Sequence, residues 1–145
     1  HPTCTTEHVD KAMIYREADI ISLHVPLTTQ TRNLVTQNEI VRMKPGTLLI
    51  NTARGGIINE QDLFDALQSG HLGGAAIDVF EQEPYNGNLV SLDQCLLTAH
   101  MGSMSVDCRA RMEIEAAEEA VQFIRGDPLK SQVPQEEYDN QLLVA

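Results

Sequence analysis

The chain has 145 residues, enough for one ordinary domain with a buried core, and it carries 21 acidic against 10 basic side chains. The formal net charge of −11 argues against nucleic acid or an anionic membrane surface as a partner. No stretch of the sequence has the length and apolar character of a membrane span, and none has the pattern of a signal segment. Because the first residue is His1 and not Met, we expect an internal fragment of a longer chain.

The cysteines and histidines point away from disulfide and metal chemistry. Cys4, Cys95 and Cys108 are odd in number and contain no CxxC pair, which favours free or buried thiols in a reducing compartment. The cytoplasm is then the default location. No spacing among the five histidines suggests a metal site, so we expect none. Three of these histidines are expected on the surface: His1, His8 and His71.

Helix and strand patterns alternate along the chain. Four apolar segments rich in β-branched residues predict strands at residues 19–25, 47–52, 74–79 and 95–98. Helices are predicted at residues 7–18, from 36 to just before 44, from 59 to 70, and at 106–125.

Local signals place the ends of these helices. Thr36 and Glu39 form a capping-box signature, and Asn59 is an N-cap followed by acidic residues in the first turn. Gly70 and Gly126 stand where the end of a helix favours glycine. One stripe of the last helix is apolar, and its acidic residues are expected to face solvent.

Strand–helix alternation with nearly continuous apolar strands predicts an α/β fold with a parallel sheet covered on both faces. Active sites of such sheets form beyond the carboxyl ends of the strands. His24, Arg54 and Asp78 stand at or just after those ends. His24 lines that cleft or only ends its strand, and the sequence leaves both open.

The chemistry of three side chains suggests a small acid as substrate. The planar fork of Arg54 can donate two parallel charge-assisted hydrogen bonds to a carboxylate. His100 suits proton transfer near neutral pH, provided that a carboxylate orients its ring and stabilises the imidazolium. Either Glu81 or Glu83 can supply that carboxylate. Together these groups fit chemistry on a 2-oxo or 2-hydroxy acid.

The sequence resembles the D-isomer-specific 2-hydroxyacid dehydrogenases from about Ala18 to Gly126. Five segments occur in the family's order: ADIISLHVP from Ala18, MKPG from Met43, LINTARGG from Leu49, GAAIDVF from Gly74 and TAHMGS from Thr98. Alanine precedes His100, where the family frequently has proline. The order and spacing of all five make a chance match improbable.

The resemblance implies a role for each site residue. Arg54 would bind the substrate carboxylate, His100 would transfer the proton on the 2-oxygen, and Glu83, directly before Pro84, would hold that histidine. Hydride would pass between C4 of the nicotinamide and C2 of the substrate. Residues that match cofactor-lining positions are Val25, Pro26, Thr31, Thr52, Ala53, Arg54 and Asp78. The cofactor would be NAD, with NADP not excluded.

The resemblance also implies an incomplete fold, Rossmann-like and doubly wound. No G-x-G-x-x-G motif is present. The four strands would be the third to sixth of the nucleotide-binding domain, whose order is 3-2-1-4-5-6, so the first strand here would lack its neighbours and the sheet could not form. Residues 1–126 would be the second half of that domain. Residues 127–145 would be a tail packing toward a missing substrate domain.

Two classes of function fit the resemblance. The first is a cytoplasmic dehydrogenase of D-2-hydroxy acids, homodimeric as a full-length protein, with a small-molecule substrate and no nucleic-acid or membrane partner. The alternative is an NAD(H)-sensing, corepressor-like binding protein with the same fold and the same three residues. Turnover with 2-oxo acids distinguishes them.

Overall fold

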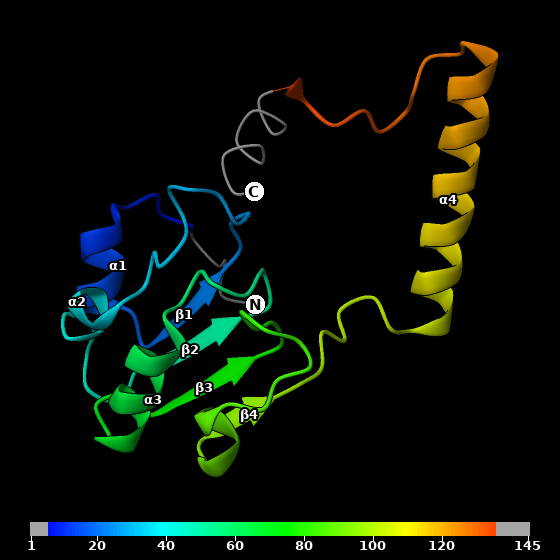
Figure 1. The fold of residues 1–145 in the computed structure, drawn as a ribbon. Helices are drawn as coiled ribbons and strands as arrows, with labels where there is room; N and C mark the ends of the chain where they lie inside the picture. Colours follow the sequence, from blue (N-terminus) through cyan, green and yellow to red (C-terminus); the bar gives the residue numbers. More distant parts are fainter. Residues whose placement is uncertain (1–5, 136–145) are drawn as a thin grey trace, which may run out of the picture. The chain divides into compact units, whose positions relative to one another are not determined.

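The computed structural model describes residues 6–135, which form two compact units, one ending at Ala99 and one beginning at His100 (Figure 1). The elements of the first unit are α1 (Lys11–Glu17), β1 (Ile20–Leu23), α2 (Gln37–Ile40), β2 (Leu48–Asn51), α3 (Glu60–Gln68), β3 (Gly74–Ile77), the 3₁₀ helix η1 (Asn88–Ser91) and β4 (Cys95–Leu97). The second unit contains α4 (Val106–Arg125). The predicted domain boundary at residue 126 stays a prediction.

The predicted helix caps are confirmed. The Thr36 side chain and Glu39 form the complete capping box of α2, and Asn59 accepts a hydrogen bond from the backbone N–H of Asp62 at the start of α3. Gly126, in the left-handed region at φ 75°, ends α4 at the predicted residue. Helix α1 begins later than predicted because the Asp10 side chain caps it by accepting from the Met13 N–H.

The sheet is parallel, as predicted, with the strand order β1-β2-β3-β4. The prediction that the first strand would lack its neighbours was wrong. Strand β1 pairs with β2 over four residues, from Ile20 opposite Leu48 to Leu23 opposite Asn51. In the order 3-2-1-4-5-6 the third and fourth strands are not neighbours, whereas β1 and β2 are. The four strands here are therefore not the third to sixth strands of that order. Each strand pairs with the strand that follows it in the sequence.

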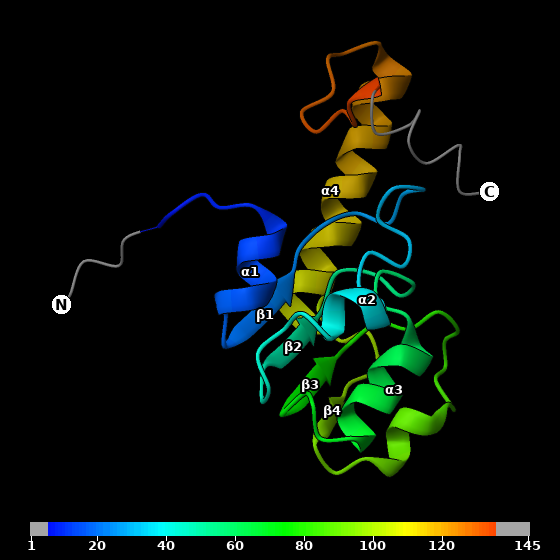
Figure 2. The same cartoon turned by 90° about the vertical axis from the view of Figure 1, so that its left-hand side faces the viewer.

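One face of the sheet supplies the core. Leu49 and Ile77 are almost fully buried and pack in one cluster with Ile40 of α2 and with Leu63 and Leu67 of α3. Helices α2 and α3 lie together against the strands, and α1 lies beside β1 (Figure 2).

No helix of the first unit covers the other face of the sheet, so the expectation of cover on both faces stays a prediction. Ile20 and Leu48, neighbours in register, are 59% and 42% exposed, and Leu96 of β4 is 66% exposed. This face is apolar and has no helix of the first unit buried against it.

The second unit consists of α4 and the segment that follows it. None of the twenty residues of α4 is buried, and its exposed apolar side chains include Phe123 and Ile124. Lys130 folds back on this helix, donating from its backbone N–H to Glu119 and pairing with Glu118. The predicted packing of the tail toward another domain stays a prediction, and residues 136–145 lie outside the described residues.

No helix in the described part of the chain combines the length and hydropathy needed to cross a membrane.

Two side-chain expectations are refined. Cys95 and Cys108 are free thiols, and burial raises the pKa of Cys95 to about 11.

His71 is not a surface residue: it is half-buried, with Nε2 at 2.8 Å from the Ile40 carbonyl oxygen. His8 is exposed as predicted. His1 and Cys4 lie outside the described residues. Among residues 6–135, no group of three or more His, Cys, Asp or Glu side chains could hold a metal ion.

Candidate active site

The predicted site residues of the first unit lie where the strands end. Val25 and Pro26 follow β1, Thr52 to Arg54 follow β2, and Asp78 follows β3. Because the three strands are parallel, these loops all leave the sheet at the carboxyl ends of the strands. Thr31 is tied to this edge, since its hydroxyl donates to the Pro26 carbonyl oxygen at 2.6 Å.

The loop after β2, residues 52–56 (the Arg54 loop), is shaped by a buried asparagine. Asn51 is 2% exposed. Its amide nitrogen donates to the Arg54 carbonyl oxygen at 2.9 Å, and its side-chain oxygen accepts from the Ala53 N–H at 3.1 Å. The side chain of Arg54 is exposed, and its Nη1 donates to the Ala53 carbonyl oxygen. The turn is therefore fixed by Asn51 and leaves the guanidinium at the surface.

The Arg54 loop packs directly on the loop after β3. A Cβ atom at Gly55 would lie 1.9 Å from the Phe80 carbonyl oxygen and 2.7 Å from the Glu81 nitrogen. Glycine after a strand can let the backbone approach a ligand. For Gly55 the structure shows another neighbour, the Phe80–Glu81 peptide group. This contact joins the loops that carry Arg54 and Glu83.

The loop after β3, residues 78–85 (the Glu83 loop), is closed on itself. The rings of Phe80 and Tyr85 stack with centroids 4.2 Å apart, and the Phe80 N–H donates to Glu83 Oε1 at 3.1 Å. Tyr85 also accepts from the Leu89 N–H at 3.3 Å. The Glu83–Pro84 peptide bond is cis. Glu83 itself is exposed, as is the alternative carboxylate Glu81.

Asp78 is a buried carboxylate at the carboxyl end of β3, 7% exposed. A buried charge needs partners, and Thr98, directly after β4, supplies one by donating its hydroxyl to Asp78 Oδ1. The backbone N–H of Asp78 donates to the Asn51 carbonyl oxygen, which ties the starts of the two loops together.

The two candidate histidines belong to different units of the chain. His24 is exposed just after β1, and its ring lies at hydrogen-bond distance from the Ser22 hydroxyl. His100 begins the second unit and has a positive φ of 53°, which few residues other than glycine adopt. Its pairing with Glu83 stays a prediction.

Four residues that shape the site had no structural role predicted for them: Asn51, Gly55, Thr98 and Glu60, whose carboxylate accepts a hydrogen bond from the Glu81 N–H. A polar residue at the end of an apolar strand was the available signal for Asn51, because such a side chain needs backbone partners. Gly55, Glu60 and Thr98 each contact a residue at least 20 positions away in the sequence, and no local sequence pattern predicts such contacts.

Gly55→Ala is expected to lower the free energy of unfolding by about 3 kcal/mol, because both nearby groups are backbone atoms that cannot rotate away. Urea unfolding measures it. Gly46→Ala is the matched control: Gly46 has φ +87° but no atom within 4 Å of an added Cβ, so only strain of about 1 kcal/mol is expected. Equal losses in the two variants would contradict the close packing at Gly55.

Comparison with known proteins identifies the fold. The family model "D-isomer specific 2-hydroxyacid dehydrogenase, NAD binding domain" matches residues 3–102. A hydroxypyruvate reductase from Thermotoga maritima is 41% identical over 116 residues, 77% of this chain and 38% of the relative. The crystal structure of a glyoxylate reductase from Paecilomyes thermophila superposes with a TM-score of 0.84 at 31% identity, covering 88% of this chain and 39% of that one.

A third relative was solved with a bound nucleotide. The D-isomer specific 2-hydroxyacid dehydrogenase from Xanthobacter autotrophicus, in complex with NADPH and MES, has a TM-score of 0.75 at 29% identity, covering 88% of this chain and 52% of that one. The chain thus spans about two fifths to one half of the length of these relatives. The match over residues 3–102 shows that the chain belongs to the D-isomer specific 2-hydroxyacid dehydrogenase family, within its NAD-binding domain.

Proposed function

We propose that this chain is part of an NAD(P)-dependent oxidoreductase that transfers a hydride between nicotinamide and C2 of a D-2-hydroxy acid or 2-oxo acid. The observation that carries the proposal is the backbone contact between the Arg54 loop and the Glu83 loop at Gly55. This contact supports the proposal because it joins the loop of Arg54, which would bind a carboxylate, to the loop of Glu83, at the carboxyl ends of the strands, where parallel sheets bind ligands.

The residues present fit the nicotinamide end of the cofactor. Asp78 is a buried carboxylate at the strand edge, a suitable acceptor for an amide donor or neighbour for a cationic ring. Val25, Pro26, Thr52 and Ala53 would line the same cleft, with Thr31 holding Pro26. The glycine-rich loop that binds pyrophosphate is absent from the 145 residues, so that end of the cofactor would be held by other parts of the protein. When bound, the cofactor supplies or accepts the hydride.

Arg54 would bind the substrate carboxylate and polarise the 2-oxo group. Its guanidinium is exposed on a turn that Asn51 fixes, so the fork is available without rearrangement of the backbone. Two parallel charge-assisted hydrogen bonds would then orient the substrate as well as bind it.

His100 would donate the proton to the 2-oxygen in reduction and remove it in oxidation. Glu83 would orient the ring and stabilise its charged form. The Phe80 N–H holds the Glu83 carboxylate in a defined position, which supports this assignment over Glu81.

The names of the relatives suggest small 2-oxo acids such as glyoxylate and hydroxypyruvate as first substrates to test. We further propose that the full-length protein is a cytoplasmic homodimer. The acidic composition disfavours a nucleic-acid partner. NADP is the second cofactor to test, because one structural relative was solved in complex with NADPH.

Oxidation of NADH by the full-length protein, with glyoxylate and hydroxypyruvate as substrates, tests the proposal. We expect saturable turnover that Arg54→Ala abolishes. The alternative is an NAD(H)-sensing, corepressor-like protein. It would bind NADH but turn over none of a panel of 2-oxo acids, and that outcome would overturn the oxidoreductase proposal.

Residues 1–145 expressed alone should neither bind NADH with useful affinity nor turn over substrate, because the pyrophosphate loop is missing. The apolar face with Ile20, Leu48 and Leu96, which no helix of the first unit covers, should make the isolated chain associate, together with the unpaired edges of the outer strands. Sedimentation and an NADH titration measure both properties. A monomer with micromolar affinity for NADH would refute this prediction.

A further inference from the structure

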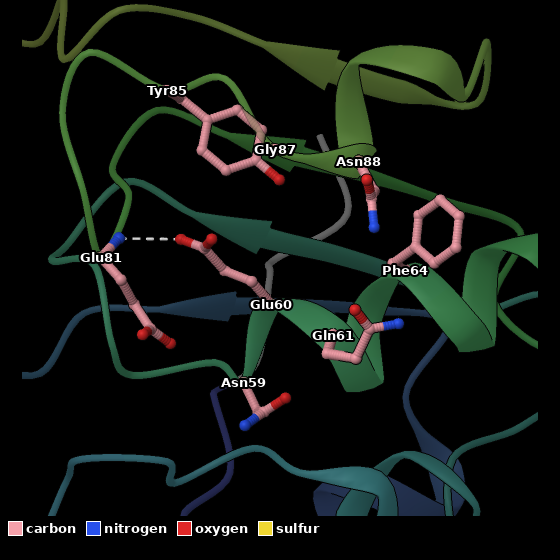
Figure 3. Close-up of a pocket in the computed structure, with 8 residues that line it drawn as sticks. All are labelled: Asn59, Glu60, Gln61, Phe64, Glu81, Tyr85, Gly87 and Asn88. Atoms are coloured by element: carbon pink, nitrogen blue, oxygen red, sulfur yellow. Dashed lines mark hydrogen bonds between the residues drawn. The ribbon is translucent and has the colours of Figure 1, made fainter.

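Glu60, the first residue of α3, reaches across to the Glu83 loop. Its Oε1 accepts a hydrogen bond from the backbone N–H of Glu81 at 2.7 Å, between residues 21 positions apart in the sequence. Figure 3 shows the Glu60 carboxylate turned toward that nitrogen, with the side chain of Glu81 directed away from it. The contact lies beside a pocket of about 330 Å³ lined by Asn59, Glu60, Gln61, Phe64, Glu81, Tyr85, Gly87 and Asn88.

The anchor of this contact is rigid. The N-terminus of α3 is capped by Asn59, and the helix is fixed in the core by Leu63 and Leu67, which are 1% and 0% exposed. Glu60 projects from the first turn of this helix and is half-buried. A carboxylate held in this way makes a charge-assisted hydrogen bond, stronger than one between neutral groups.

The group that Glu60 holds is central to the Glu83 loop. Two consecutive backbone N–H groups of the loop each donate to a glutamate, that of Phe80 to Glu83 and that of Glu81 to Glu60. Gly55 packs against the peptide group that joins Phe80 to Glu81. Glu60 therefore fixes the point at which the Arg54 and Glu83 loops meet.

We propose that Glu60 is a positioning residue, which pins the Glu81 N–H to α3 and thereby sets the orientation of Glu83. The consequence for catalysis rests on the function proposed above, whereas the pinning of the loop does not depend on it.

The surroundings of Glu60 make its charge sensitive to pH. Burial raises the pKa of the Glu60 carboxyl, the hydrogen bond from the Glu81 N–H opposes this rise, and the charge of Glu81 adds to it. The titratable side chains that line the pocket with Glu60 are Glu81 and Tyr85. Because the pKa is raised, Glu60 takes up its proton at a higher pH than an exposed glutamate, and the neutral acid is the weaker acceptor. Protection of the Glu81 amide should therefore decline as pH falls through this pKa.

Hydrogen exchange at the Glu81 amide of the full-length protein tests the pinning directly. Glu60→Ala should lower the protection of that amide by about tenfold, since the acceptor is lost. Glu60→Gln keeps a neutral acceptor, so it should retain part of the protection and lose its dependence on acidic pH. Asp65→Asn is the matched control, because it removes one negative charge from an exposed position of the same helix. Protection that is unchanged in Glu60→Ala would overturn the proposal.

Kinetics of the same variants test the consequence. We expect Glu60→Ala to lower kcat for a 2-oxo acid by about tenfold with little change in KM, partial recovery in Glu60→Gln, and wild-type values in Asp65→Asn. Glu60→Ala should also move the alkaline limb of the pH profile to lower pH, because a Glu83 that is no longer held in position would stabilise protonated His100 less. Loss of protection without these changes would reduce Glu60 to a structural residue and overturn its positioning role. A wild-type protein without turnover would instead overturn the proposed function, while exchange would still decide the contact.

Discussion

Arg54→Lys in the full-length protein is expected to lower kcat/KM for a 2-oxo acid by about a hundredfold or more, while the Kd for NADH stays nearly unchanged. Lysine keeps the positive charge but cannot donate two parallel hydrogen bonds to one carboxylate. The loss of a charged hydrogen bond and of the alignment that the fork imposes accounts for a factor of this size. Steady-state kinetics and a cofactor titration measure the two quantities.

The structure makes this variant informative because Asn51 fixes the Arg54 loop, to which the guanidinium adds a single exposed hydrogen bond, from Nη1 to the Ala53 carbonyl oxygen. Asn51 holds the turn through the Ala53 N–H and the Arg54 carbonyl oxygen, and both are backbone groups that lysine preserves. The unfolding transition should therefore move little, since only one exposed hydrogen bond of the loop is lost. Arg32→Lys is the matched control: the Nη1 of Arg32 lies 3.3 Å from where a Cβ at Gly56 of the same loop would be, and the proposed function assigns Arg32 no role. Unchanged kcat/KM in Arg54→Lys would remove Arg54 from the substrate site.

The parts of the fold that the sequence predicted correctly depend on neighbours along the chain. A cap joins residues two or three positions apart, so Thr36 with Glu39 and Asn59 with Asp62 could be recognised before the structure was known. The glycine after α4 is recognised for the same reason. Arg54 and Asp78 could be placed at the same end of the sheet because each follows a strand and the strands were predicted to be parallel.

The parts that were missed depend on neighbours in space. The pattern of β1 is the same whether β2 or a strand of another segment lies beside it, so the order of the sheet could not be read from the strand itself. Glycine at position 55 is compatible with a ligand or with a peptide group, and only the fold shows that Phe80 is the neighbour. Glu60 looks like an ordinary acidic residue in the first turn of a helix, where such residues are favoured. Its contact with Glu81 spans 21 positions.

Glu83→Gln should displace the pH profile of the reaction. In the reductive direction His100 must begin protonated, so activity is present at low pH and falls as the ring loses its proton. The anion of Glu83 favours the charged ring, and its neutral isostere does not. The falling limb of kcat/KM should therefore move to lower pH, and kcat/KM near neutral pH should drop by about a hundredfold. In the oxidative direction the same ionisation produces the rising limb, which should also move to lower pH.

Glu81→Gln is the matched control for this prediction, because it removes the neighbouring carboxylate and leaves in place the Glu81 backbone N–H that Glu60 binds. It should leave both limbs where they are. The two directions together separate proton transfer from a general change in the fold, since a destabilised protein would lose activity at both ends of the profile. Limbs that stay in place or move upward in Glu83→Gln would contradict the pairing with His100. A displacement in Glu81→Gln alone would assign the role to Glu81, the alternative that the sequence left open.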